Sequence, residues 1–159
     1  MRILILAVGR LKDGPERELV ARYGERAVAT GRPLGFTGFD SVELPESRAQ
    51  RPVDRKAEEA VALRAKAGDS GLVVFDEKGS SPTSEAFAGL LAAGRDAGRR
   101  SMAMVIGGPD GLDPALAGTA EARISFGRMT LPHQIVRGLV AEQLYRAMTI
   151  LSGHPYHRA

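Results

Sequence analysis

The 159-residue sequence contains no cysteine. This absence excludes a disulfide scaffold, a thiolate nucleophile and zinc held by thiolates. No stretch approaches the ~18 consecutive apolar residues that a membrane span requires, and the short apolar run at residues 2–8 lacks the cleavage pattern of a signal peptide. A chain of this length buries roughly 70% of its unfolded surface. We therefore expect a single domain over residues 1–159, cytoplasmic, with no membrane partner.

Several well-known catalytic and nucleotide-binding motifs are also missing. There is no Gly-x-Gly-x-x-Gly after the first apolar run and no Gly-x-x-x-x-Gly-Lys-Ser/Thr anywhere. A Gly-x-Ser-x-Gly elbow is absent as well. The histidines do not form His-Glu-x-x-His, so no metal site is expected. These absences count against a classical dehydrogenase, a P-loop hydrolase and a serine hydrolase.

The formal net charge of +3 is unevenly distributed along the chain. Residues 1–121 carry 17 basic and 18 acidic side chains, whereas residues 122–159 carry five arginines against Glu142 alone. All three histidines also lie in this last segment. Arginine presents a planar fork that suits phosphates and stacks on bases. On charge alone, an anionic partner such as nucleic acid and a solvated basic helix are equally good interpretations.

Strand and helix patterns alternate along the chain. Strands are expected at residues 2–8, 34–44, 72–75, 102–106 and 124–126. Helices are expected at residues 15–31, 54–67, from 84 onward, after 114 and from 131 to 151. Asp54 is expected to cap the second helix, and Thr83 or Ser81 the third. This alternation predicts an α/β fold, with a mostly parallel sheet and helices on both faces.

Ligands of open α/β sheets bind outside the carboxyl ends of the strands. Three segments occupy such positions here: Phe75-Asp76, residues 107–111 and residues 126–131. The double glycine at 107–108 lets backbone approach a ligand closely, although it also suits an ordinary turn. Residues 45–53 lack apolar periodicity, which predicts either a substrate-contacting loop or a tolerated surface insertion.

Four motifs occur in order along the chain and carry a family resemblance. They are Leu6-Ala7-Val8-Gly9-Arg10-Leu11-Lys12, Ile106-Gly107-Gly108-Pro109-Asp110-Gly111-Leu112, Met129-Thr130-Leu131-Pro132-His133-Gln134, and Ala141-Glu142-Gln143-Leu144-Tyr145-Arg146-Ala147 followed by Gly153-His154-Pro155-Tyr156-His157-Arg158. Together they resemble the RlmH (YbeA-like) family, the pseudouridine N3-methyltransferases of large-subunit ribosomal RNA. The resemblance extends over essentially the whole chain.

The resemblance implies a SPOUT-type fold with a C-terminal trefoil knot, a homodimer, and S-adenosyl-L-methionine as cofactor. The cofactor-binding positions that it implies are Phe75, Gly107, Phe126, Gly127, Arg128, Met129, Thr130 and Leu131. Ordinary core packing is the other reading for the two phenylalanines and Leu131. The family commonly has serine where Gly127 stands, which removes a hydroxyl that could contact the ligand or the loop.

The implied reaction is attack of a pseudouridine N3 of 23S ribosomal RNA on the activated methyl group, on the assembled ribosome. We expect Tyr156 and His157 to act at the base as catalytic residues. The RNA is expected to contact the basic side chains of Arg137, Arg146, His154 and Arg158. Because this tail follows the last helix, it is expected to reach the partner subunit's cofactor pocket. His133 is expected to serve as a helix-start residue.

Two other functions fit the same residues. One is a SPOUT methyltransferase that acts on another RNA. The second is a non-catalytic protein of this fold that binds RNA or the ribosome.

Overall fold

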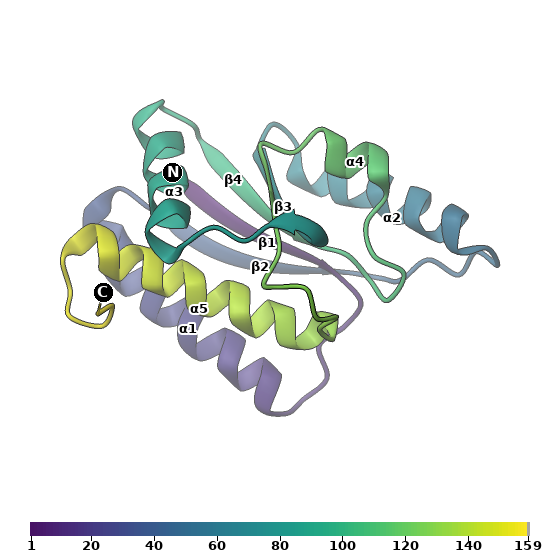
Figure 1. Cartoon of the computed structure of the whole chain (residues 1–159), viewed down its shortest axis with the longest axis horizontal. Helices are drawn as coiled ribbons and strands as arrows, with labels where there is room; N and C mark the ends of the chain where they lie inside the picture. Colours follow the sequence, from purple (N-terminus) through teal and green to yellow (C-terminus); the bar gives the residue numbers. More distant parts are fainter. Residues whose placement is uncertain (159) are drawn as a thin grey trace.

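The computed structural model describes residues 1–158, in which five parallel strands form a sheet with helices on both faces (Figure 1). The strand order is β2-β1-β4-β3-β5. In chain order the elements are β1 (Arg2–Val8), α1 (Pro15–Gly31), a short 3-10 helix (Arg32–Leu34), β2 (Gly38–Leu44), α2 (Pro52–Ala67), β3 (Gly71–Ser80), α3 (Ser84–Asp96), β4 (Ser101–Ile106), α4 (Pro114–Gly118), β5 (Ala122–Ile124) and α5 (His133–Ser152). The predicted α/β class and parallel sheet are confirmed.

The strand register places Phe75, Ile106 and Ile124 side by side at one edge of the sheet. Phe75 of β3 lies level with Ile106 of β4 on one side and with Ile124 of β5 on the other. All strand pairs are parallel, so the segments that follow these three residues leave the sheet at the same edge. This is the carboxyl edge, where α/β folds bind ligands.

The side chains of the strands divide the core into two layers. On one face, Ile3 and Ile5 pack with Leu144 and Met148 under α1, α3 and α5. On the other face, residues such as Leu6 and Leu63 form a second cluster under α2 and α4. Figure 1 shows α1 and α5 running side by side along one face, with α2 and α4 on the other. The sheet is covered on both faces, which explains its nearly continuous apolar strands.

The boundaries differ from the prediction at several points. Strand β2 begins only at Gly38, because the chain before it forms the 3-10 turn, and β3 continues to Ser80. Asp54 is not a helix cap: α2 begins at Pro52, and the Asp54 carboxylate accepts a hydrogen bond from Arg51 Nε at 2.6 Å. Thr83 does cap α3, since its hydroxyl accepts from the Ala86 amide.

Residues 45–51 carry no regular secondary structure and connect β2 to α2. They are held by defined contacts: the Ser47 amide donates to Glu59 Oε1 at 3.0 Å, and the Arg55 guanidinium donates to the carbonyls of Ala49 and Gln50. Of the helices in residues 1–158, none combines the length and the apolar character needed to cross a membrane.

Candidate active site

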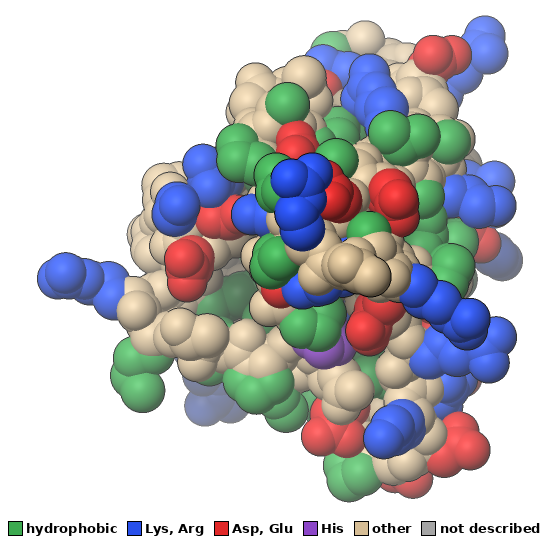
Figure 2. Space-filling view, turned by 90° about the vertical axis from the view of Figure 1, so that its right-hand side faces the viewer, with side chains coloured by type: hydrophobic (Ala, Val, Ile, Leu, Met, Phe, Trp, Pro, Cys, Tyr) green, Lys and Arg blue, Asp and Glu red, His purple; other side chains and the backbone are tan. Residues whose placement is uncertain are grey.

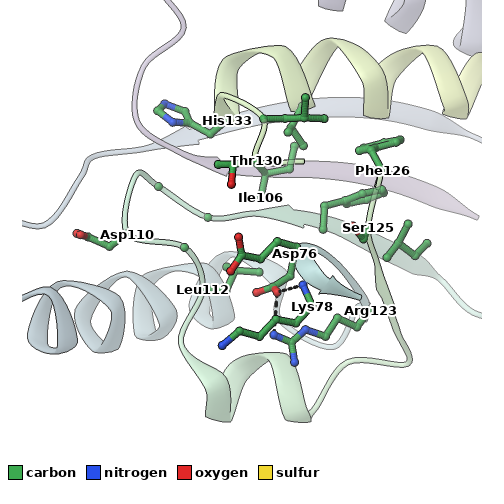
Figure 3. Close-up of a pocket in the computed structure, with 18 of the residues that line it drawn as sticks. Asp76, Lys78, Ile106, Asp110, Leu112, Arg123, Ser125, Phe126, Thr130 and His133 are labelled. Carbon is green, nitrogen blue, oxygen red and sulfur yellow. Dashed lines mark hydrogen bonds and ion pairs between the residues drawn. The ribbon is translucent and has the colours of Figure 1, made fainter. Parts of the chain in front are cut away.

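A cavity of about 410 Å³ opens at the carboxyl edge of the sheet, between the ends of β3, β4 and β5 and the start of α5 (Figure 3). This volume is within the usual range for small-molecule sites. Seven of the eight residues predicted to hold the cofactor line it: Phe75, Gly107, Phe126, Gly127, Met129, Thr130 and Leu131. The eighth, Arg128, is exposed and is not part of the lining. The structure therefore brings together residues that are up to 56 positions apart in the sequence.

Two phenylalanine rings form the apolar wall of the cavity. Phe75 and Phe126 stack with ring centroids 5.5 Å apart and an interplanar angle of 13°. Phe75 also meets Phe87 of α3 edge-on, with centroids 6.3 Å apart. Core packing and cofactor contact are thus compatible for these rings, because the same side chains pack in the core and face the cavity.

The glycine loop after β4 has no room for a side chain at Gly107. A Cβ atom added to Gly107 would lie 2.9 Å from the carbonyl carbon of Gly111. Gly111 itself has a φ of +83°, a conformation that favours glycine. The Arg55 guanidinium fixes the loop from α2, because its Nε and NH2 groups donate to the Asp110 carboxylate at 2.6 and 3.1 Å. The loop therefore presents backbone, held in a set position, to the cavity.

Gly127 occupies a turn that a side chain would strain. Its φ is +133°, and the Ser125 hydroxyl closes the turn by donating to the Gly127 carbonyl at 2.7 Å and accepting from its amide at 3.1 Å. The hydroxyl of Ser125 thus orders this loop although position 127 carries none. The positive φ explains why glycine is well tolerated here.

Three charged side chains lie on the side of the cavity away from Phe126 (Figure 3). The Asp76 carboxylate accepts hydrogen bonds from Arg123 NH2 and from the Lys78 amide, both at 2.8 Å. The sequence placed Phe75-Asp76 at a strand end where ligands bind, but it gave the Asp76 side chain no role. It did not single out Arg123 or Lys78 as residues of this site.

His133 also lines the cavity, from the first residue of α5. Its burial, and then the nearby Arg137 guanidinium, lower the pKa of His133 below the ordinary value. The imidazole is therefore neutral at physiological pH. His133 is the first residue of α5, as expected, and its side chain also faces the cavity.

Arg137 does not lie on an RNA-accessible surface, contrary to the expectation for it. The residue is 2% exposed, and its NH2 group donates to the carbonyl oxygens of Val8 and Gly9 at 2.5 and 2.8 Å. Its NH1 group donates to Glu43 Oε1 at 3.2 Å. Arg137 thus ties α5 to the end of β1, because the last carbonyls of a strand need donors when they are buried.

The C-terminal tail folds back on the far end of α5. The Tyr156 hydroxyl donates to Glu142 Oε1 at 3.1 Å, and Arg146 lies over the Tyr156 ring, 4.9 Å from its centroid. His157 Nε2 lies 2.5 Å from Glu85 Oε1 of α3. In Figure 1 this tail is at the opposite end of α5 from the helix start that lines the cavity. Within one chain, the predicted catalytic residues and the predicted cofactor residues are therefore apart.

The basic excess of residues 122–159 is largely neutralised by ion pairs. Three of its arginines are paired with acids, as Arg123–Asp76, Arg137–Glu43 and Arg146–Glu142. His154 and the Arg128 and Arg158 side chains are exposed. Figure 2 faces the end of the molecule at the right of Figure 1, where Lys and Arg alternate with Asp and Glu. The net charge of residues 122–159 therefore overstates how much unpaired positive charge lies on the surface.

The chain matches known proteins over almost its entire length. Residues 1–157 match the family described as "Predicted SPOUT methyltransferase". A protein of Methylorubrum populi named "Ribosomal RNA large subunit methyltransferase H" is 54% identical, covering 99% of this chain and 97% of its own length. A protein of the same name from Sinorhizobium medicae is 56% identical, with both chains covered completely.

A solved structure shares the fold at low sequence identity. The probable methyltransferase from Bordetella pertussis Tohama I is 17% identical, covers 92% of this chain and 95% of its own, and has a TM-score of 0.50. The chain therefore belongs to the SPOUT methyltransferases, in the family of ribosomal RNA large subunit methyltransferase H, because residues 1–157 match the family and its relatives are more than 50% identical.

Proposed function

We propose that this protein transfers a methyl group from S-adenosyl-L-methionine to N3 of a pseudouridine in 23S ribosomal RNA, on the assembled ribosome in the cytoplasm. The observation that carries the proposal is the cavity at the carboxyl edge, lined by seven residues that match the cofactor positions of the RlmH family. The names of the relatives, which are ribosomal RNA large-subunit methyltransferases, support the RNA class of the substrate.

The residues around the cavity fit an adenosyl ligand. The stacked rings of Phe75 and Phe126 offer an apolar wall to a planar base, and the Gly107 backbone can approach the ligand without a side chain between them. When bound, S-adenosyl-L-methionine supplies a methyl group already activated by its sulfonium. The task of the protein is then to hold the acceptor nitrogen in line and to accommodate the loss of its proton.

Tyr156 is not suited to removing that proton. Burial, and then hydrogen bonds with Tyr23 and Glu142, raise the pKa of Tyr156 above its ordinary value. The hydroxyl is therefore protonated at neutral pH, so no phenolate is present to take up the proton. We assign Tyr156 a stacking and hydrogen-bonding role at the base, as part of the catalytic tail.

His157 is held by partners on two sides. Its Nε2 faces Glu85, and its Nδ1 lies 3.4 Å from Arg146 NH1. The neutral form with the proton on Nε2 satisfies both contacts, since Nδ1 then accepts from the arginine. His157 and Arg146 thus act together as a polar pair that can contact the RNA.

We further propose that the active site is shared across a homodimer. Helix α5 has 20 residues, and the tail that follows it contacts Glu142 and Glu85, neither of which lines the cavity of the same chain. Exposed apolar side chains near the start of α5 support an interface there: Met129 is 82% exposed, Leu131 36% and Ile135 41%. A partner chain seated near this patch can bring its tail to the cavity.

Mixing two inactive variants tests the shared site. A Tyr156→Ala chain keeps its cavity and a Gly107→Trp chain keeps its tail, so a heterodimer contains one complete site. Random pairing should restore about a quarter of the wild-type methylation rate. If each pure variant is inactive and the mixture is no better after subunit exchange, each chain works with its own tail and the sharing is refuted.

Mass mapping of ribosomal RNA tests the reaction and the substrate together. RNA from cells that lack the gene should be without one methyl group on a pseudouridine of 23S RNA, and the wild-type gene should restore it. A methyl group missing from another RNA would replace the proposed substrate. An unchanged methylation pattern, with RNA binding intact, would favour a non-catalytic binding protein.

A further inference from the structure

The charged end of the cavity contains a carboxylate with one unused oxygen. Asp76 lies directly after Phe75 on β3, and its side chain is only 11% exposed. Both of its hydrogen bonds, from Arg123 and from the Lys78 amide, end on Oδ1. In residues 1–158 no group donates to Oδ2. Oδ2 is not fully enclosed by the protein, so this acceptor is open to a ligand that brings a donor.

Two cationic side chains line the cavity on the same side as this carboxylate (Figure 3). The Arg123 side chain is 36% exposed, and its Nε is buried without a hydrogen-bond partner in the described residues. The Lys78 side chain is exposed and also lines the cavity. Because Asp76 occupies only one group of the guanidinium, Arg123 retains donors for an anion. The lining around Asp76 therefore contains two carboxylates, of Asp76 and the exposed Glu77, and two cations.

The rest of the cavity has the opposite character. Figure 3 shows Phe126 on the side toward α5, whereas Asp76, Lys78 and Arg123 gather on the side toward α4. The cavity is thus apolar and aromatic at one end and zwitterionic at the other. A ligand that matches both ends carries a planar base and, away from it, an ammonium and a carboxylate.

We propose that Asp76 and Arg123 form the subsite for the amino-acid part of the S-adenosyl ligand. The α-ammonium donates to Asp76 Oδ2, and the α-carboxylate pairs with the Arg123 guanidinium, with Lys78 at the rim. The adenine then lies toward Phe75 and Phe126. This inference rests on the proposed function, because it requires an S-adenosyl compound in this cavity.

Calorimetric binding of three ligands to the intact protein tests the subsite. S-adenosylhomocysteine carries the whole amino acid, its decarboxylated analogue lacks the carboxylate, and 5′-methylthioadenosine lacks both charged groups. Asp76→Asn should weaken S-adenosylhomocysteine about tenfold or more, because a charge-assisted hydrogen bond is lost, and change 5′-methylthioadenosine less than about twofold. Arg123→Met should weaken S-adenosylhomocysteine but not the decarboxylated analogue.

Asp110→Asn is the matched control, because Asp110 is the other aspartate of the lining that pairs with an arginine. Its effect should fall on all three ligands alike. Binding of 5′-methylthioadenosine to the Asp76→Asn protein shows that the cavity is still folded. Where that protein does not fold, Arg123→Met and Arg123→Lys give the same comparison from the other partner.

The possible results separate this inference from the proposed function. Equal weakening of S-adenosylhomocysteine and 5′-methylthioadenosine by Asp76→Asn, or no weakening at all, overturns the amino-acid subsite and leaves the cofactor cavity standing. If the wild-type protein binds none of the three ligands, the proposed cofactor and the subsite fall together.

Discussion

Replacing Arg137 with methionine tests how much stability a buried guanidinium gives to the site. Methionine keeps an unbranched apolar side chain of similar length but donates no hydrogen bond. The change removes the guanidinium donor from the carbonyl oxygens of Val8 and Gly9. Glu43 Oε1 loses its ion pair with Arg137 but still accepts from the Leu11 amide. It also removes a charge whose burial already lowers the pKa of Arg137.

The magnitude follows from these contacts. Each buried carbonyl that loses its partner costs about 1–3 kcal/mol, so the two together cost about 2–6 kcal/mol. Relief of the buried charge offsets part of this, since burying an ion costs several kcal/mol. We expect a net loss of about 3 kcal/mol in the free energy of unfolding. For a chain of this size, the melting temperature should fall by about 6–12 °C.

Urea unfolding followed by circular dichroism measures the effect, with Arg128→Met as the control. Arg128 carries the same charge but is exposed, so its replacement should stay within about 0.5 kcal/mol of the wild type. The stability of Arg137→Lys should be intermediate, because one ammonium cannot reach the three acceptors as the planar guanidinium does. If Arg137→Met is as stable as Arg128→Met, the guanidinium is not needed to hold the end of β1.

Other outcomes are expected at the cavity and the tail. Gly107→Ala should weaken S-adenosylhomocysteine binding about tenfold by calorimetry, because the added Cβ would lie 2.9 Å from Gly111 and shift the loop; unchanged affinity would show that the loop is pliable. The lowered pKa of His133 means that the unfolded chain binds a proton before the folded chain does, so stability should fall as the pH drops below about 6.5. Unfolding curves of His133→Gln should show a smaller loss between pH 7.5 and 5, and equal losses would contradict this. Glu142→Gln keeps an acceptor for Tyr156 but removes the ion pair with Arg146; kcat should fall while S-adenosylhomocysteine affinity is unchanged, and a parallel loss of affinity would argue against a tail-specific role.

The order of the elements could be predicted from the sequence because both faces of the sheet are buried. Continuous apolar runs such as residues 3–8 and 102–106 mark the inner strands, and the glycine and proline positions mark their ends. The cavity could be predicted for the same reason, since parallel strands bring their carboxyl ends to one edge. Asp54 misled the prediction because a proline at the first helical position started α2 two residues earlier.

The burial of Arg137 follows from its position on α5 and not from its charge. Arg137 lies three, four and seven residues before Val140, Ala141 and Leu144, all of which are buried. That spacing puts the arginine on the buried stripe of α5, so the signal was present in the sequence. The pairing of Asp76 with Arg123 had no such local signal, because it depends on the adjacency of β3 and β5.

The length of α5 determines where the protein can accept an insertion. One residue inserted in this helix turns everything beyond it by about 100° and moves it by about 1.5 Å, which would misplace Tyr156 and His157 relative to residues 126–131. The irregular residues 45–51 belong to no helix or strand, so a change in their length rotates no element against its neighbours. In the proposed dimer the length of α5 therefore sets the position of the tail. We expect an insertion within residues 133–152 to abolish function, whereas residues 45–51 should tolerate the same insertion.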